Sequence, residues 1–251
     1  MSNVLSISPT EVIHYLKMSC QIPDVIEGIV TRKIIVETAS REGITVEEEE
    51  LQQEGDRLRF AKKLVKASDT WAWLQIHRLS LDEFEKLVYY NVLSTKVAHH
   101  LFKDNIEAFF YQNQLNFVKA VTYEVLLDDY DLALELFYAL EENELTFQEI
   151  AREYIPNPEL RRAGGYQGVR QRKDFRPEIA AAVFAATPPK IIKPIVTPKG
   201  VYLIWVEEII QPELNQLLRE QIVTDLFNAW LKQQITHTQI NIQLEDESVY
   251  A

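Results

Sequence analysis

The sequence predicts an α+β protein with an all-helical N-terminal part, a small α+β domain and a long C-terminal helix. Two observations support this division. Between residues 1 and 128 only Gly28, Gly43 and Gly55 occur, and the apolar residues recur at helical spacing. From residue 117 onward, β-branched and aromatic segments alternate with short helical ones around a stretch rich in glycine and proline.

Capping signals and apolar spacing predict the N-terminal helices. Ser8, Pro9 and Glu11 form a capping-box signature that opens the first helix. Further helices are predicted over 23–41, from residue 45, and over 68–77, 80–102 and 103–113. In the second helix, the residues expected to face the core are Val25, Ile29, Ile34 and Ile35.

The second half of the chain changes its periodicity. A strand is predicted over 117–127, helices over 130–142 and 146–154, and a loop with tight turns and a short strand over 155–175. A helix over 177–186 and two strands over 191–196 and 201–206 follow. The last predicted helix, 211–234, has an apolar face made of Leu214, Leu217, Leu218, Ile222, Leu226 and Trp230.

Composition excludes several classes of function. The net charge of −12 favours solubility and argues against a nucleic-acid partner. The single cysteine, Cys20, lies in a predicted helix, so we expect it to be a buried apolar residue and not a nucleophile. The first residues lack the features of a signal peptide and no apolar run is long enough for a membrane span. We therefore expect a cytoplasmic protein without membrane insertion.

The sequence contains no phosphate-binding glycine loop, cluster of metal ligands or nucleophile elbow. His99 and His100 are adjacent in a predicted helix and so do not share a face, which argues against a metal site. We expect neither a cofactor nor a metal ion.

Four segments of the second half resemble the parvulin family of peptidyl-prolyl cis-trans isomerases: 133–154, 164–168, 177–184 and 194–206. The second has the sequence Gly-Gly-Tyr-Gln-Gly, and the last contains the turn Thr-Pro-Lys-Gly before an apolar strand. The helices on either side resemble those of the SurA- and PrsA-type foldases. This resemblance implies that the N- and C-terminal helices pack into one chaperone module, from which the isomerase domain projects.

The resemblance divides the chain into four parts: a helical module 1–113, a parvulin-like domain 114–208, a C-terminal helix 209–240 that completes the module, and an acidic tail 241–251. It also implies the residues of the site. The positions of the apolar pocket for proline are Gln167, Phe175 and Ile179. The polar cluster is Tyr123 or Glu124, Asn157 or its neighbour Pro158, Thr197 and Tyr202.

Histidines that the family carries in this cluster are missing, because no histidine lies between His100 and His237. Rotation about an X-Pro bond needs no proton transfer, so their loss is compatible with catalysis. In one interpretation, Tyr202 and Tyr123 replace the imidazoles as hydrogen-bonding groups and the domain isomerises client polypeptides. In the other, it binds unfolded or proline-containing segments without catalysis, as an adaptor for export or peptide modification.

For two further groups of residues, the sequence allows two interpretations each. The basic run Arg170, Arg172 and Lys173 could select acidic residues before proline, or could be a solvated loop. The aromatic residues of the helical module either line a groove for unfolded segments or belong to its core: Trp71, Trp73, Phe84, Tyr89 and Tyr90. A third alternative for the helices is that they form a homodimer.

Overall fold

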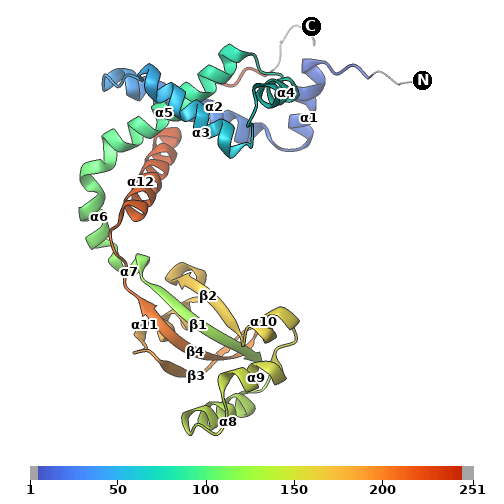
Figure 1. Ribbon diagram of the computed structural model, residues 1–251, viewed down its shortest axis with the longest axis vertical. Coiled ribbons are helices and arrows are strands. Elements are labelled where there is room, and N and C mark those ends of the chain that lie inside the picture. The colour runs from blue at the N-terminus through green and yellow to red at the C-terminus, as the bar shows by residue number, and fades with distance from the viewer. Residues whose placement is uncertain (1–4, 245–251) are drawn as a thin grey trace. The chain divides into compact units, whose positions relative to one another are not determined.

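The computed structural model describes residues 5–244. The chain divides into two compact units (Figure 1): one runs up to Ile106 and resumes at Arg219, and the other is Glu107–Leu218. Of the predicted acidic tail 241–251, residues 245–251 lie outside the described residues. Within the described part of the chain, every helix is too short or too polar to span a membrane. The predicted α+β fold is confirmed.

The helical unit is built on α5, which contacts both α2 and α3. Its elements are α1 (Pro9–Met18), α2 (Ile22–Arg41), α3 (Glu48–Ala61), α4 (Ala67–His77), α5 (Leu81–Phe102), the 3-10 helix η1 (Lys103–Asn105) and α12 (Gln216–His237). The predicted capping boxes open α1 and α5: the Ser8 and Ser80 hydroxyls accept from the backbone N–H groups of Glu11 and Glu83. These caps explain why both helices begin where the sequence predicts.

Polar side-chain pairs connect the helices of this unit. Lys96 of α5 lies 2.7 Å from Glu50 of α3, and His99 of α5 lies 2.8 Å from Glu220 of α12. The aromatic residues divide between core and surface. Phe84 is buried in a cluster with Leu74 that the half-buried Trp73 packs against, whereas Trp71 is exposed.

The face that α2 buries differs from the predicted one. Val25 and Ile29 are exposed, and the buried residues of the helix are Val30, Ile35, Thr38 and Ala39. Apolar residues occur on more than one side of α2, so the packing partner α5 decides which side becomes the core. The prediction was therefore wrong for Val25 and Ile29.

Helix α12 begins at Gln216 and not at 211. The segment after β4 contains Pro212, and Asn215 accepts the Leu218 N–H through its side-chain oxygen at 3.0 Å, as an N-cap does. The fully buried face consists of Ile222, Val223, Phe227 and Leu231. Leu217, which the sequence placed on the apolar face, is exposed because it lies in the first turn.

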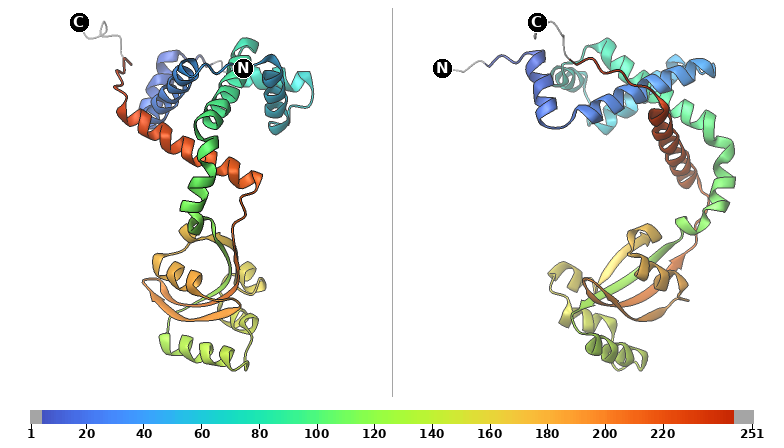
Figure 2. Two further views of the ribbon diagram at one scale, coloured as in Figure 1. Left: turned by 90° about the vertical axis from the view of Figure 1, so that its left-hand side faces the viewer. Right: turned by 180° about the vertical axis from the view of Figure 1, so that it is seen from behind.

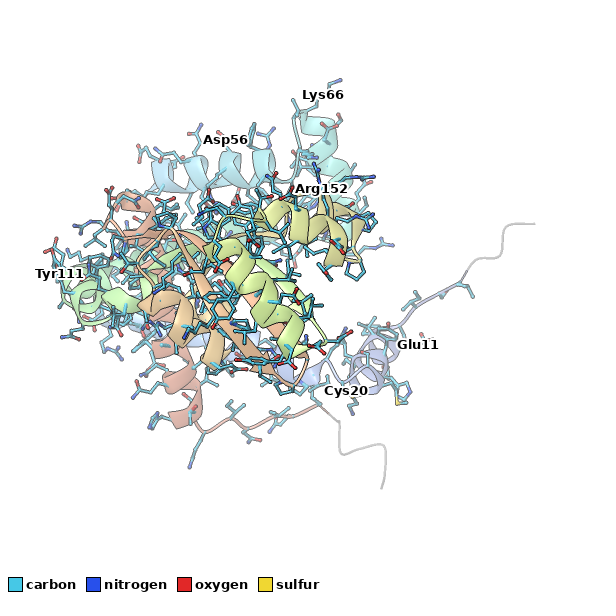
Figure 3. All side chains as sticks on the ribbon, turned by 90° about the horizontal axis from the view of Figure 1, so that it is seen from below. Glu11, Cys20, Asp56, Lys66, Tyr111 and Arg152 are labelled. Carbon is cyan, nitrogen blue, oxygen red and sulfur yellow. The ribbon has the colours of Figure 1, made fainter. Side chains whose placement is uncertain are left out.

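Cys20 is also placed differently from the prediction. Helix α1 ends at Met18, and Cys20 follows in the turn with a φ of 57° and an exposed side chain (Figure 3). A turn at the surface has no core to bury a thiol, so the expected buried position is wrong.

The second unit contains a four-stranded antiparallel sheet of order β2-β1-β4-β3. Its strands are β1 (Lys119–Leu127), β2 (Tyr166–Gln171), β3 (Lys190–Thr197) and β4 (Gly200–Ile210). Its helices are α6 (Ile106–Gln112), α7 (Gln114–Phe117), α8 (Tyr130–Glu141), α9 (Phe147–Tyr154), α10 (Pro158–Arg162), the 3-10 helix η2 (Arg172–Asp174) and α11 (Pro177–Ala185). The segment 155–175 contains the predicted short strand, as the edge strand β2, and also the short helix α10 and η2, which the sequence did not predict.

The sheet carries a core on each face (Figures 1 and 2). One core joins α8 and α9 to β1 and β4 through residues such as Val125, Leu136, Ile150 and Leu203. The other joins α11 to the opposite face through Ile179, Val183, Ile204 and Val206. Successive residues of β1 point to opposite faces, so the register of this strand decides which side chains reach which core.

Replacement of Ile222 tests the observed face of α12. Ile222 is fully buried, whereas Leu217 is 80% exposed on the same helix. We expect Ile222→Ala to lower the free energy of unfolding by about 2–5 kcal/mol, because it leaves a cavity in the core. Leu217→Ala, the matched control, should change it by less than about 0.5 kcal/mol. Urea unfolding followed by circular dichroism measures both, and equal losses would contradict the assigned face.

Candidate functional site

A cavity of about 260 Å³ opens in the second unit, between the sheet and the segment that joins α9 to α10. Strands β1, β2 and β4 supply four of its residues, and the α9–α10 segment supplies the rest. Its lining residues are Glu124, Leu126, Tyr154, Ile155, Pro156, Asn157, Leu160, Gln167 and Tyr202. A cavity of this size, mostly apolar with a few convergent polar groups, has the character of a binding site for a side chain or a short peptide segment.

The register of β1 brings Glu124, and not Tyr123, to this cavity. Glu124 is paired with Ile204 of β4 and shares its face of the sheet. Tyr123 points to the other face, where its ring stacks on Trp205 with 4.8 Å between centroids and meets Phe147 edge-on at 6.3 Å. Burial raises the pKa of the Tyr123 phenol, with Glu207 adding to the effect, so the hydroxyl stays protonated at neutral pH.

Tyr202 of β4 lines the same cavity as Glu124. Strand pairing places Tyr202 beside Leu126, two residues beyond Glu124 on the same face of β1. Glu124, one of the two alternatives for the first-strand histidine position, and Tyr202, the last-strand position, therefore line one cavity. They supply a carboxylate and a phenol hydroxyl in place of two imidazoles.

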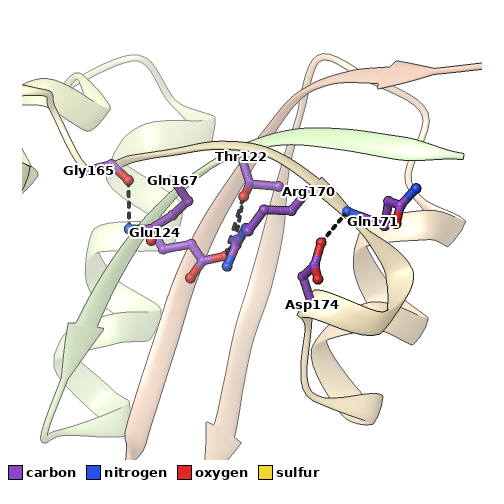
Figure 4. Close-up of polar contacts among 7 residues, drawn as sticks. All are labelled: Thr122, Glu124, Gly165, Gln167, Arg170, Gln171 and Asp174. Carbon is purple, nitrogen blue, oxygen red and sulfur yellow. Dashed lines mark hydrogen bonds and ion pairs between the residues drawn. The ribbon is translucent and has the colours of Figure 1, made fainter. Parts of the chain in front are cut away.

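Arg170 of β2 reaches across the sheet edge to Glu124 and Thr122 of β1 (Figure 4). Its guanidinium forms an ion pair with the Glu124 carboxylate and donates to the Thr122 hydroxyl oxygen at 2.8 Å. The Thr122 hydroxyl in turn donates to Glu124 Oε1 at 3.3 Å. Both Thr122 and Glu124 are buried, and this charge-assisted cluster gives each of their side chains a hydrogen-bond partner.

The same guanidinium lies over the ring of Phe175, 4.1 Å from its centroid. Phe175 and Ile179 are buried in the core around α11 and do not line the cavity. Arg170 Nε is buried without a hydrogen-bond partner, although Nη2 of the same group is fully engaged. Of the three positions predicted to hold proline, only Gln167 lines the cavity, and Arg170 covers the ring of Phe175.

Asn157 and Gly165 shape the walls of the cavity. The side-chain oxygen of Asn157 accepts the N–H groups of Glu159 and Leu160, both at 2.9 Å, and so caps α10 at its start. Pro158, the alternative position, is the first residue of that helix. Gly165 has a φ of 84°, and a Cβ there would lie 2.8 Å from the Glu124 carbonyl oxygen, so only glycine allows this approach.

Thr197 has a structural role away from the cavity. Its hydroxyl donates to the Gly200 carbonyl at 2.9 Å and accepts the Lys199 N–H at 3.2 Å. These bonds close the turn between β3 and β4, as Ser and Thr side chains commonly do. Thr197 does not line the cavity.

The sequence did not predict the apolar wall of the cavity: Leu126, Tyr154, Ile155, Pro156 and Leu160. The tyrosine that ends α9, followed by Ile155 and Pro156, was the one available signal, since a proline stops the helix and turns the chain. Arg170 was also missed as a partner of Glu124, because it was assigned to a loop. Among residues 5–244, no three His, Cys, Asp or Glu side chains are grouped as a metal site would need.

Residues 101–217 match the family model described as the PPIC-type PPIASE domain. Over these residues the chain matches the parvulin-type domain family. The match spans the four-stranded sheet and its helices, and therefore the cavity that Glu124 and Tyr202 line. The comparison of curated protein sequences gives no match to this chain.

Solved structures of peptidylprolyl isomerases and of a parvulin domain match this chain. The isomerase PrsA from Bacillus cereus has a TM-score of 0.50 at 15% identity, covering 97% of this chain and 92% of its own. PrsA from Bacillus anthracis has a TM-score of 0.49 at 14% identity, covering 87% and 100%. The parvulin domain of PpiD from E. coli matches 39% of this chain and 95% of its own, at 15% identity and a TM-score of 0.34. At these identities the likeness concerns the fold alone.

Removal of either partner of the Glu124–Arg170 pair should destabilise the parvulin-type domain. We expect Arg170→Met to lower the free energy of unfolding by about 3 kcal/mol, because it leaves the buried Glu124 carboxylate without its partner, and Glu124→Gln to lower it less, because Arg170 is only partly buried. The double variant should lose less than the sum of the two. Urea unfolding of all four proteins, followed by circular dichroism, measures this cycle. Additive losses would contradict a direct interaction.

Proposed function

We propose that this protein is a parvulin-family foldase that binds unfolded, proline-containing segments of client polypeptides and accelerates the isomerisation of their X-Pro bonds. The observation that carries the proposal is the convergence of Glu124 and Tyr202 on one cavity of the parvulin-type domain. The apolar wall formed by Tyr154, Ile155 and Pro156 suits a proline ring or an apolar neighbour of it. The similar structure from Bacillus cereus is that of a peptidylprolyl isomerase, which agrees with this class of function.

Isomerisation of an X-Pro bond requires no covalent or proton-transfer step by a side chain. The barrier of about 18–20 kcal/mol comes from lost amide conjugation, and a catalyst lowers it by binding the twisted amide better than either planar form. In our proposal the apolar wall excludes water and the Tyr202 hydroxyl donates a hydrogen bond to the rotating amide. Glu124, paired with Arg170, keeps a fixed negative charge beside it. No residue forms a covalent bond or transfers a proton.

One observation favours the second candidate, a client-binding adaptor without catalysis. Arg170 lies over the ring of Phe175, so the apolar surface that the resemblance assigns to proline is covered. A site without this surface can bind a peptide and still hold its proline too loosely to favour the twisted amide. The two candidates share the cavity and differ in whether binding changes the isomerisation rate.

Several predictions from the sequence concern the setting of this function. The cytoplasmic location, the limits of the four parts at residues 113, 208 and 240, and homodimer formation through the helices stay predictions. Selection of acidic residues before proline also stays a prediction. Arg170 is engaged with Glu124, and Arg172 lies over the Phe184 ring at 4.8 Å, so neither group is simply a solvated cation.

A proline-isomerisation assay on short peptides tests the proposal. We expect the protein to accelerate the reaction and Tyr202→Phe, which removes only the hydroxyl, to lower kcat/KM by at least about 10-fold. Tyr138→Phe is the matched control, because Tyr138 is exposed on α8 and lies outside the cavity. If the wild-type protein binds the peptides but leaves the spontaneous rate unchanged, the adaptor is correct and the enzyme proposal is wrong.

Arg170→Met tests the role of the covered Phe175 ring. Methionine has an unbranched apolar side chain of similar length, but it lacks the charge with which Arg170 pairs with Glu124. We expect the variant to isomerise X-Pro peptides several-fold faster, roughly 3- to 10-fold, because Phe175 becomes available to the proline ring. The assay is run below the unfolding temperature of the variant, which calorimetry measures. A slower rate in the folded variant would show that Arg170 supports the reaction.

A further inference from the structure

Helices α2 and α5 of the helical unit contact each other (Figure 1). A second concave surface is lined by residues of these two helices. This groove has a volume of about 770 Å³, within the usual range for binding sites. Its lining residues are Ile29, Arg32, Lys33, Val36, Glu37, Ser40 and Arg41 of α2 and Tyr90 of α5. We name it the α2–α5 groove.

The floor of the α2–α5 groove is apolar and uncovered. Ile29 and Val36 lie seven residues apart and so share one face of α2. They are 48% and 39% exposed. Tyr90 adds an aromatic ring from α5. Val25, exposed one turn before Ile29, extends the same stripe. An apolar stripe with this spacing matches the contact surface that one helix offers to another.

The rim of the groove carries positive charge in an acidic protein. Arg32, Lys33 and Arg41 line the groove together with one carboxylate, Glu37, and Arg41 also pairs with Glu42 at 3.2 Å. Three cations beside two carboxylates leave a local positive excess, whereas the whole chain has 26 basic and 38 acidic residues. Arg32 is held over the Tyr90 ring, with its guanidinium carbon 4.8 Å from the centroid. The local excess of cations therefore opposes the net charge of the molecule, and it attracts a negatively charged partner.

We propose that the α2–α5 groove binds an acidic, amphipathic helical segment of a client polypeptide. Ile29 to Arg41 spans about 18 Å along α2, which accommodates about three turns of a partner helix. Its apolar face would lie on Ile29, Val36 and Tyr90, and its carboxylates would meet Lys33 and Arg41. This site is separate from the isomerase cavity, and recognition of the segment requires no proline.

Fluorescence anisotropy with two labelled peptides tests the proposal. Both contain about three helical turns with the same apolar face and no proline; one carries glutamate at its polar positions and the other lysine. We expect the acidic peptide to bind at least about 10-fold more tightly than the basic one. Lys33→Glu should weaken the acidic peptide by about 10-fold and lower the salt dependence of its binding.

Lys86→Glu is the matched control, because Lys86 is exposed on α5 outside the groove and the net charge changes equally. This control should bind the acidic peptide within about 2-fold of the wild-type protein. Ile29→Ser should weaken both peptides. Equal losses in the Lys33 and Lys86 variants, or equal binding of the two peptides, would overturn the proposal.

Two further measurements separate this site from its alternatives. Tyr202→Phe should leave binding of the proline-free peptide unchanged, so failure of the isomerase proposal does not affect this result. Sedimentation of the wild-type protein and the Lys33→Glu variant tests a second copy of the chain as occupant. A dimer that Lys33→Glu converts to a monomer would show that the groove binds another copy, and the client proposal would be wrong.

Discussion

The buried carboxylate of Glu124 on β1 pairs with the partly buried guanidinium of Arg170 on β2, and the site depends on this ion pair. Glu124 is buried, and its pairing with Arg170 and Thr122 satisfies its carboxylate within the sheet. A buried carboxylate without such a partner would be expensive in free energy. Because Arg170 reaches Glu124, its guanidinium also covers Phe175. The same interaction therefore stabilises the sheet edge and separates the Phe175 ring from the cavity that Glu124 lines.

The geometry of the strands explains how a parvulin-type domain can lack histidines and still have this cavity. The register of β1 against β4 shifts between Val121 and Thr122, directly before the residues that face the cavity. Such irregularities re-aim side chains and strengthen the local twist. Thr122, Glu124 and Leu126 then follow on one face, with Tyr202 opposite Leu126. The cavity thus depends on strand geometry, and the chemical identity of its polar groups can change without loss of the fold.

The sequence predicted the domain from short segments whose spacing reflects local structure, such as the Thr146 cap of α9 and the turn at Thr197. It left Tyr123 and Glu124 as alternatives, because a shift of one residue in a strand exchanges its two faces. Only the pairing with β4 decides between them. Arg170 could not be recognised as the partner of Glu124, since the two lie 46 positions apart and meet only through the pairing of β1 with β2. For α2, likewise, the contact with α5 and not the apolar pattern determined the buried face.

The central claim is that client segments bind in the cavity between Glu124 and Tyr202, and not on the covered surface of Phe175 and Ile179. A nuclear magnetic resonance titration of the protein with a short X-Pro peptide tests it most directly. The account predicts that the largest shifts occur at the backbone amides of Glu124, Gln167 and Tyr202, with those of α11 nearly unchanged. Shifts concentrated at Phe175 and Ile179 would contradict it.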